Sequence, residues 1–377
     1  MKICILTQPL KENYGGILQA YALQEILRRS GHQVWTEDRL DDLATLKRSL
    51  ILRVKNFLYF LIKTRKFVFT NMAAYRPISH QFIKSNIRLT EISQSHTKEL
   101  FAQYGFEAYI VGSDQVWRPV YSPFLYNYFL DFTKDDNVKR IAYAASFGSD
   151  EWEFSPEQTS HCAALLQKFD AVSVREKTAV KLCETYFGID ATQTLDPTLL
   201  LAKEDYLSLI PEKSINNNTK YCMAYLLDAN TDKYNIMRDI SDQLQCKGKT
   251  IAPSHHPLPK EWNYYENFNH LSMVDWLNQF NLASFVVTDS FHGCAFALLF
   301  NKPFVAIDNK RRGSARFQSI LGLFDLQDRL VNSYDDFLRK KSEILFTPID
   351  YDNVNAILAK KRAESINFLI SALTSSF

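Results

Sequence analysis

Glycine is scarce in this sequence, with 11 residues in a chain of 377. A protein built on several glycine-rich phosphate loops is therefore disfavoured. Net charge is also small, at +2, which argues against a nucleic-acid-binding protein. No apolar run approaches the ~20 residues of a membrane-spanning helix, and the run at residues 3–6 is too short for a secretory signal peptide. We therefore expect a cytoplasmic protein.

Cysteine is sparse and its spacing is irregular. The six cysteines are Cys4, Cys162, Cys183, Cys222, Cys246 and Cys294. No two of them have CxxC spacing, and most lie in apolar segments. We therefore expect buried free thiols in a reducing compartment, and neither a disulfide framework nor a zinc site.

What the sequence does contain is an alternation of strand and helix patterns. Residues 2–7 and 33–38 are short apolar runs that flank a helical pattern at 17–31, which together predict a βαβ unit. Further short strands are expected at 106–111, 140–145, 170–174, 221–227, 250–252, 284–288 and 303–307. The alternation predicts α/β architecture with mostly parallel sheets.

A domain boundary is expected at residues 197–220, which carry two prolines and an Asn-rich run. This boundary divides the chain into an N-terminal domain, 1–205, and a C-terminal domain, 206–350, each large enough for a core of its own. Residues 351–377 carry apolar side chains at helical spacing. They predict a terminal helix that packs back on the body of the protein.

Acidic residues are absent from residues 43–90, while ten Lys and Arg alternate there with Leu, Ile and Phe. Two interpretations are open. A basic amphipathic segment can lie on an anionic membrane surface. The segment can equally be a helical insertion whose apolar side packs on the N-terminal domain.

Four polar motifs follow predicted strands. They are NYGGILQAYALQ at 13–24, VGSDQVWRP at 111–119, SVRE at 173–176 and TDSFHG at 288–293. In open α/β sheets, ligands bind outside the carboxyl ends of the strands. The motifs therefore predict one shared cleft.

The first two motifs supply the candidate cleft residues. These are Asn13, Tyr14, Gly15, Gly16, Gln19, Ser113, Gln115 and Trp117. A helix N-terminus after a glycine pair favours an anion or a sugar hydroxyl, although such a pair can also be a simple turn. Asp114 can accept a hydroxyl proton or merely cap the turn that follows it.

The other two motifs supply charged candidates. Arg175 lies at a strand-to-helix corner, which suits bidentate binding of a carboxylate or phosphate; the alternative is an ion pair with Glu176. His292 lies at a helix N-terminus beside Asp289 and Ser290, which suits proton transfer; the alternative is a capping or core histidine. No ligand spacing predicts a metal site.

These motifs carry a resemblance to a known family. The opening NYGGILQAYALQ, then GSDQVW, VSVRE, LDPTLLL at 195–201 and TDSFHGCAFALLFNKPFVAI resemble the polysaccharide pyruvyl transferases, in the family's order along nearly the whole chain. The resemblance implies a glycosyltransferase-B-like fold, with two Rossmann-like domains facing each other across a cleft. It also implies transfer of the pyruvate unit of phosphoenolpyruvate onto a sugar, which makes a cyclic ketal and releases phosphate without a further cofactor.

The resemblance assigns roles to individual residues. Arg175 matches the family's S-x-R arginine in the donor site, and His292 matches its active-site histidine, our candidate general acid. Asp114 or Asp289 is the candidate base. Relatives with an Arg-Leu-His motif have arginine where this chain has Ser290. We expect Arg316, with Arg311 or Arg312, to supply the missing cation.

The resemblance further implies an acceptor sugar, held on a lipid carrier at the inner face of the cytoplasmic membrane. Segment 43–90 is the candidate contact with that membrane. Two alternatives remain open. One is a glycosyltransferase of the same fold that uses a nucleotide sugar, and the other is a glycan-binding module without catalysis.

Overall fold

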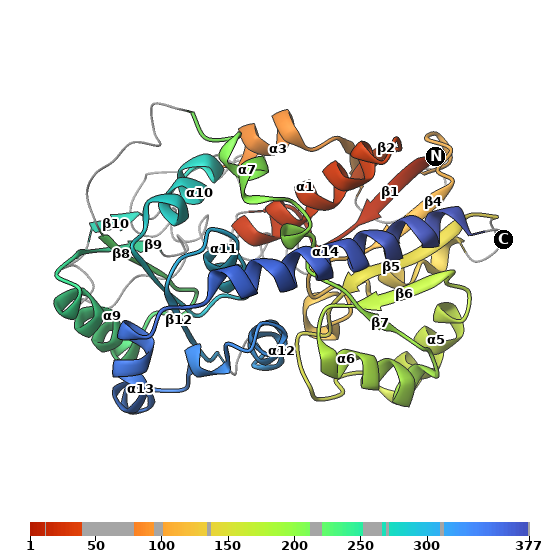
Figure 1. The fold of residues 1–377 in the computed structure, drawn as a ribbon. Helices are drawn as coiled ribbons and strands as arrows, with labels where there is room; N and C mark the ends of the chain where they lie inside the picture. The colour runs from red at the N-terminus through yellow and green to blue at the C-terminus, as the bar shows by residue number, and fades with distance from the viewer. Residues whose placement is uncertain are drawn as a thin grey trace, which may run out of the picture.

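The computed structural model describes most of the chain. The described residues are 1–11, 13–39, 79–93, 101–133, 137–211, 221–251, 266–268, 271–309 and 313–375. They form two α/β domains, each built on one parallel sheet, which lie side by side (Figure 1). The α/β prediction with two Rossmann-like domains is confirmed.

Within the described residues, the N-terminal sheet has seven strands in the order β3-β2-β1-β4-β5-β6-β7, and all neighbouring pairs are parallel. The strands are β1 (Lys2–Leu6), β2 (Gln33–Arg39), β3 (Leu89–Ser93), β4 (Ala108–Val111), β5 (Lys139–Ala145), β6 (Ala171–Val174) and β7 (Thr192–Gln193). The strand order reverses between β1 and β4. Such a switch point is where α/β sheets bind ligands.

The described part of the C-terminal sheet repeats this plan with six parallel strands in the order β10-β9-β8-β11-β12-β13. The strands are β8 (Tyr221–Tyr225), β9 (Lys247–Ile251), β10 (Glu266–Phe268), β11 (Phe285–Thr288), β12 (Phe304–Ile307) and β13 (Leu330–Val331). Its switch point lies between β8 and β11. Each domain thus has one switch point at which a ligand is expected to bind.

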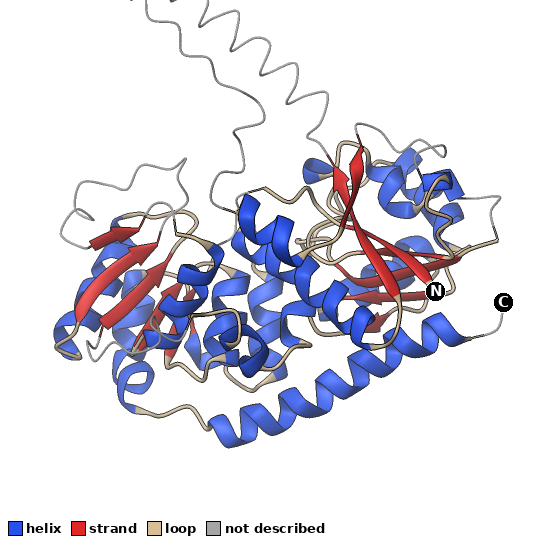
Figure 2. Ribbon diagram, turned by 90° about the horizontal axis from the view of Figure 1, so that it is seen from above, coloured by secondary structure: helices blue, strands red, loops and turns tan. Residues whose placement is uncertain are grey.

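Helices connect the strands and pack around both sheets (Figure 2). They are α1 (Tyr14–Arg29), α3 (His80–Asn86), α5 (Pro156–Leu166), α6 (Lys177–Leu182), α7 (Lys203–Leu207), α9 (Thr231–Gln243), α10 (Met273–Leu282), α11 (Phe291–Leu299), α12 (Ala315–Leu323), α13 (Tyr334–Phe346) and α14 (Tyr351–Thr374). None of the helices within the described residues is both long enough and apolar enough to cross a membrane.

Side-chain caps fix where the two motif helices begin. Asn13 Oδ1 accepts a hydrogen bond from Gly16 N at the start of α1, and Ser290 Oγ accepts one from Gly293 N at the start of α11. Such caps satisfy backbone donors that a helix leaves unpaired. Residues in the first turn of each helix, His292 included, therefore have a defined position.

Residues 79–90 are the part of the 43–90 segment that the structure describes. Residues 80–86 form α3, but β3 then pairs with β2 as an edge strand of the N-terminal sheet. This strand is short and mixes polar with apolar residues, so it gives little strand signal by itself. Residues 40–78 of the segment lie outside the described residues.

The prediction of free thiols is wrong for one pair. Cys222 in β8 and Cys246 just before β9 form a disulfide, with a Cα–Cα distance of 6.0 Å. Parallel pairing of β8 with β9 brings these residues together, which the spacing in sequence does not reveal. The other four cysteines are free and buried, as expected.

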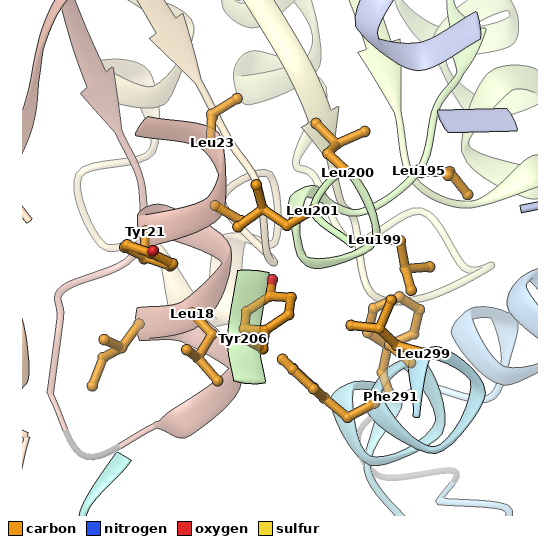
Figure 3. Close-up of a cluster of buried hydrophobic side chains, with 14 of the residues drawn as sticks. Leu18, Tyr21, Leu23, Leu195, Leu199, Leu200, Leu201, Tyr206, Phe291 and Leu299 are labelled. Carbon is orange, nitrogen blue, oxygen red and sulfur yellow. The ribbon is translucent and has the colours of Figure 1, made fainter. Parts of the chain in front are cut away.

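One apolar cluster continues from the first domain into the second. Figure 3 shows Leu18 of α1, Leu199 and Tyr206 of the connecting segment, and Phe291 of α11 in this cluster. The ring of Tyr206 packs edge-on against Phe296 of α11, with centroids 5.1 Å apart. Burial of this shared apolar surface holds the domains together.

Helix α14 runs from the C-terminal domain across to the N-terminal sheet (Figure 1). Ser365 Oγ accepts a hydrogen bond from Leu195 N at 3.0 Å, and Lys139 Nζ lies 3.3 Å from Ser375 Oγ. Leu369 and Leu373 are buried against the body. This helix therefore bridges the two domains.

Candidate functional site

Three buried carboxylates surround the guanidinium of Arg175, which directly follows β6. Arg175 Nη1 donates a 2.9 Å hydrogen bond to Asp196 Oδ2, and Nε donates a 3.3 Å bond to Glu176 Oε1. Its Nη2 lies 3.6 Å from Asp114 Oδ1. All four residues are more than nine-tenths buried. We call these four residues the arginine cluster. Because they are buried away from water, the positive charge of Arg175 stabilises the negative charges of the carboxylates.

The neighbouring groups hold Arg175 and Asp196 in their charged forms. Burial acts to lower the pKa of Arg175, but the three neighbouring carboxylates outweigh it and raise that pKa above the usual value. Burial likewise acts to raise the pKa of Asp196. His292, Arg175 and the N–H of Thr198 reverse this and bring the pKa of Asp196 below its usual range.

Asp196 is oriented by the short 3₁₀ turn Pro197–Leu199 that it precedes. Its Oδ1 accepts hydrogen bonds from Thr198 N and Oγ1 at 3.0 and 2.7 Å. Its Oδ2 accepts a bond from Ser113 Oγ at 3.2 Å as well as the bond from Arg175. Together these bonds hold the Asp196 carboxylate in a single orientation.

His292 brings the C-terminal domain to this cluster. It lies in the first turn of α11, is 5 % exposed, and places Nε2 3.7 Å from Asp196 Oδ2. The other side of the imidazole packs on Gly15 of α1. A Cβ at position 15 would lie 2.0 Å from His292 Nδ1, so only glycine leaves room for the ring. Motifs far apart in sequence thus meet at this histidine.

Three buried polar atoms at this place have no hydrogen-bond partner within the part of the chain that the structure describes. They are Arg175 Nη2, Glu176 Oε2 and His292 Nε2. Most buried polar atoms in native proteins are hydrogen-bonded. Two donors and an acceptor that lack a hydrogen bond from the described residues mark a place where a polar ligand completes the bonding.

A cavity of about 100 Å³ lies beside the cluster, between the domains. Arg175 and Asp196 line it from the N-terminal domain, Phe291 and Arg316 from the C-terminal domain, and α14 contributes a further wall. Burial, together with the charge of Arg175, lowers the pKa of Arg316 to about 10. Arg316 therefore remains positive at neutral pH, and two arginine cations border one cavity.

Asp289 has a different environment from the predicted one. Its carboxylate accepts hydrogen bonds from Leu227 N at 2.5 Å, Asp228 N at 3.0 Å, Lys233 Nζ at 2.7 Å and Asn309 Nδ2 at 3.2 Å. These bonds tie together the loops after β8, β11 and β12. None of them reaches the arginine cluster.

Ser290 stands where the Arg-Leu-His relatives have arginine, and here it caps α11. Besides accepting from Gly293 N, it donates its own N–H to Thr288 Oγ1 at 3.1 Å. Residues 310–312, including the predicted donor residue Arg312, lie outside the described residues. Arg316 is the predicted replacement cation that the structure places at the cavity.

The NYGG motif lies at the domain interface. Tyr14 stacks on Trp276 with centroids 5.2 Å apart and an interplanar angle of 9°, and its hydroxyl donates to Leu271 O at 2.8 Å. Both partners belong to the C-terminal domain. Asn13 and Gly16 form the cap of α1, which holds Gly15 against His292.

Two further predicted cleft residues support the cluster from behind. Gln19 is fully buried; its Nε2 donates to Thr7 Oγ1 at 2.8 Å and its Oε1 accepts from Ser113 N at 3.0 Å. Ser113 in turn donates to Asp196. These residues fix the geometry of the carboxylate.

Gln115 is half-buried beside Asp114, and its Oε1 accepts a 3.2 Å bond from Arg118. Trp117 does not match its predicted place on the cleft wall. It is fully buried, stacks on Phe129, and donates its indole N–H to Tyr128 O at 2.9 Å. Trp117 is a core residue of the N-terminal domain.

Asp196 was not among the residues singled out from the residue patterns, although it contacts both Arg175 and His292. Its local sequence, Asp-Pro-Thr, is a helix-start signal and carries no catalytic signature. Its position next to Arg175 in the sequence indicates only an ion pair for Glu176. Among the described residues, no group of three or more His, Cys, Asp or Glu side chains is arranged to hold a metal ion.

The fold and the site define a two-domain α/β protein of the glycosyltransferase-B type, with its polar centre between the domains. The UDP-GlcNAc 2-epimerase of Neisseria meningitidis, bound to UDP-GlcNAc, is similar over 99 % of both chains at 10 % identity, with a TM-score of 0.58. A putative UDP-N-acetylglucosamine 2-epimerase of Listeria monocytogenes covers 100 % of this chain and 97 % of its own at 9 % identity, with a TM-score of 0.57. Arabidopsis thaliana UGT89C1, complexed with UDP-L-rhamnose, covers 99 % of both chains at 8 % identity, with a TM-score of 0.54.

At such identities the likeness shows the fold alone, and the predicted glycosyltransferase-B-like fold is confirmed. The family model of the polysaccharide pyruvyl transferases matches residues 13–311. The chain therefore belongs to the polysaccharide pyruvyl transferase family. No protein of curated function matches it.

Proposed function

We propose that this protein transfers the pyruvate unit of phosphoenolpyruvate onto a sugar of a polysaccharide precursor, forming a cyclic ketal and releasing phosphate. The observation that carries the proposal is that two buried donors, Arg175 Nη2 and His292 Nε2, lack a hydrogen bond from the described residues, and that Arg175 lines a cavity together with Arg316. Family membership supports the same reaction class.

The donor is a small dianion or trianion with a carboxylate and a phosphate. Charge-assisted bonds from arginine are the strongest that a protein offers to such groups. Arg175 Nη2 and the Arg316 guanidinium are the two described cationic groups that we assign to it. Three carboxylates already surround Arg175, and Arg316 brings a second guanidinium to the cavity that we assign to the donor.

The chemistry follows from these groups. A proton from His292 Nε2 passes to the CH₂ carbon of the donor and makes C2 an oxocarbenium-like electrophile. A sugar hydroxyl adds to C2 while its proton passes to Asp114, and that proton then leaves with phosphate as the C2–O bond breaks. The second hydroxyl closes the ketal and returns a proton to His292. Asp196 keeps the imidazole oriented and offsets its charge.

The nucleotide-sugar alternative finds less support at the switch point of the C-terminal sheet. The backbone N–H groups of Leu227 and Asp228, with Lys233, form an anion-binding arrangement there, but the Asp289 carboxylate fills it. A nucleotide diphosphate would have to displace that buried carboxylate. This arrangement favours a donor bound at the arginine cluster.

The acceptor in this proposal is a sugar on a lipid carrier at the inner face of the cytoplasmic membrane, reached through the basic segment 43–90. Each Lys or Arg near an anionic surface contributes about 1 kcal/mol. We therefore expect weak, salt-sensitive binding of the protein to anionic vesicles in a flotation assay. If wild-type protein does not bind such vesicles at low salt, segment 43–90 is better explained as an insertion that packs on the N-terminal domain.

The test of the reaction is phosphate release. Purified protein is incubated with phosphoenolpyruvate and a panel of lipid-linked and soluble glycans, and in parallel with UDP-sugars. We expect phosphate from phosphoenolpyruvate only when an acceptor is present. Release of UDP in the parallel arm, without phosphate from phosphoenolpyruvate, would instead identify a glycosyltransferase. No release in either arm would favour a binding module.

A further inference from the structure

An exposed aromatic ring lies in the loop that follows Asp114 of the arginine cluster and has no part in the proposed chemistry. Tyr121 ends the 3₁₀ turn Pro119–Tyr121, seven residues after Asp114, and is 43 % exposed. Its neighbour Val120 is 66 % exposed. Exposed large hydrophobic side chains are few among the described residues, so two adjacent ones in the loop after Asp114 point to a binding surface.

Arg118 supports this ring from one side. The Arg118 guanidinium lies 4.8 Å from the ring centroid of Tyr121. It is itself held by Glu153, with bonds of 3.0 and 2.9 Å, and by Gln115 Oε1 at 3.2 Å. Because Arg118 covers one face, the exposed area of Tyr121 belongs to the opposite face and its edge.

The backbone beneath the ring is also fixed. Gln8 Nε2 donates to Gln115 O at 3.0 Å and to Ser122 Oγ at 2.9 Å, and Ser122 Oγ donates to Val116 O at 2.8 Å. The turn that carries Tyr121 therefore keeps its position relative to Asp114, one residue before Gln115. Binding residues on such a rigid support lose little entropy when a ligand binds.

The ring lies toward the C-terminal domain. The phenol of Tyr121 interacts electrostatically with Arg316, which lines the cavity. The domains touch nearby, since a Cβ at Gly313 would lie 1.6 Å from Gly148 O. Arg118, which covers the ring, donates to Gln115 Oε1, and a Cβ at Gly148 would lie 2.0 Å from that same oxygen. Tyr121 therefore lies close to the place where the two domains meet.

We propose that the exposed face of Tyr121 is the platform on which the acceptor pyranose stacks. The electron-rich face of an aromatic ring suits the apolar C–H face of a pyranose, and Asp114 and Arg316 lie where its hydroxyls meet the donor. The identification of this sugar as the pyruvate acceptor rests on the proposed function; the stacking itself does not.

Saturation-transfer NMR tests the platform without catalysis. The probes are methyl β-D-galactopyranoside, methyl α-D-mannopyranoside and methyl β-D-glucopyranoside, added to wild-type protein and to two variants. We expect saturation of pyranose C–H protons by wild-type protein, and a loss of affinity of about three- to tenfold in Tyr121→Ala. Tyr121→Phe keeps the ring and should keep binding.

The matched control is Tyr186→Ala, which removes a tyrosine of similar exposure that stacks on Trp152. It should bind as wild type does. Equal binding by Tyr121→Ala and Tyr186→Ala, or no saturation of any probe by wild-type protein, would overturn the platform. Phosphate release is measured separately, so sugar binding that depends on Tyr121 with no turnover of phosphoenolpyruvate would leave the platform standing and reject pyruvyl transfer.

Discussion

His292 Nε2 and Asp196 Oδ2 lie 3.7 Å apart, and the two residues belong to opposite domains. Asp196 also accepts a hydrogen bond from Arg175, so one carboxylate joins this arginine to the candidate general acid. The contact requires the present arrangement of the domains, which the Tyr14–Trp276 stack supports. The reactive geometry is therefore a property of the domain interface.

Replacing Asp196 should change how stability depends on pH. Its pKa is lower in the folded protein than in the unfolded chain, so its ionised form stabilises the fold. That contribution is fully present above the unfolded pKa of ~3.9 and is lost as pH falls through the lower folded value. Urea unfolding of Asp196→Asn between pH 7 and pH 3 should show a weaker loss of stability than wild type.

The control for this prediction is Asp190→Asn, which changes an exposed carboxylate that lies just before β7. Its pH dependence should follow that of wild type. Identical profiles for the Asp196 and Asp190 variants would show that Asp196 gains nothing from its buried partners.

Gly15→Ala should impair turnover through His292. The added methyl group would lie within 2.0 Å of the imidazole, so the ring must move. Misplacing a catalytic group by about 1 Å can cost about a hundredfold in rate. The measurement is kcat with phosphoenolpyruvate. The control is Gly322→Ala in α12, where a Cβ would make an ordinary 3.6 Å contact with Gln327 Nε2. Wild-type kcat in Gly15→Ala would contradict the placement of the ring.

The two arginines should differ in their effects. Arg316→Gln should raise the KM for phosphoenolpyruvate by about tenfold or more, because a charge-assisted bond contributes about 1.5–3 kcal/mol. Arg175→Ala should mainly destabilise the protein, by about 3–5 kcal/mol, because it leaves three buried carboxylates without their cation. Donor kinetics and urea unfolding distinguish these effects. An unchanged KM in Arg316→Gln would remove Arg316 from the donor site.

Asp289→Asn should lower the melting temperature without a specific effect on chemistry. The change removes the charge that Lys233 faces and weakens the bonds to the loop after β8. Thermal unfolding and kcat per folded molecule are the measurements. A stable variant with a large loss of kcat would restore Asp289 as the candidate base.

The fold was predictable from sequence because buried parallel strands and amphipathic helices leave strong periodic patterns. That the polar motifs gather at strand ends was predictable for the same reason, since those patterns also show where each strand ends. Trp117 shows the limit: its motif follows a strand end, but the indole turns into the core. Asp196 shows a second limit of prediction from sequence. An aspartate before a helical turn can cap that turn or position a functional group, and the sequence pattern is the same in both cases. The Cys222–Cys246 pair depends on strand order, which sequence spacing does not contain.

The most direct test of the account follows both phosphate and the donor carbons. Phosphoenolpyruvate labelled with ¹³C is incubated in D₂O with the acceptor that supports phosphate release, and the glycan is examined by NMR. We predict a labelled ketal whose methyl group carries one solvent deuteron, formed together with phosphate, and at least about a hundredfold slower formation with His292→Ala. Unlabelled glycan, or a labelled ketal formed at the wild-type rate by His292→Ala, would contradict the account.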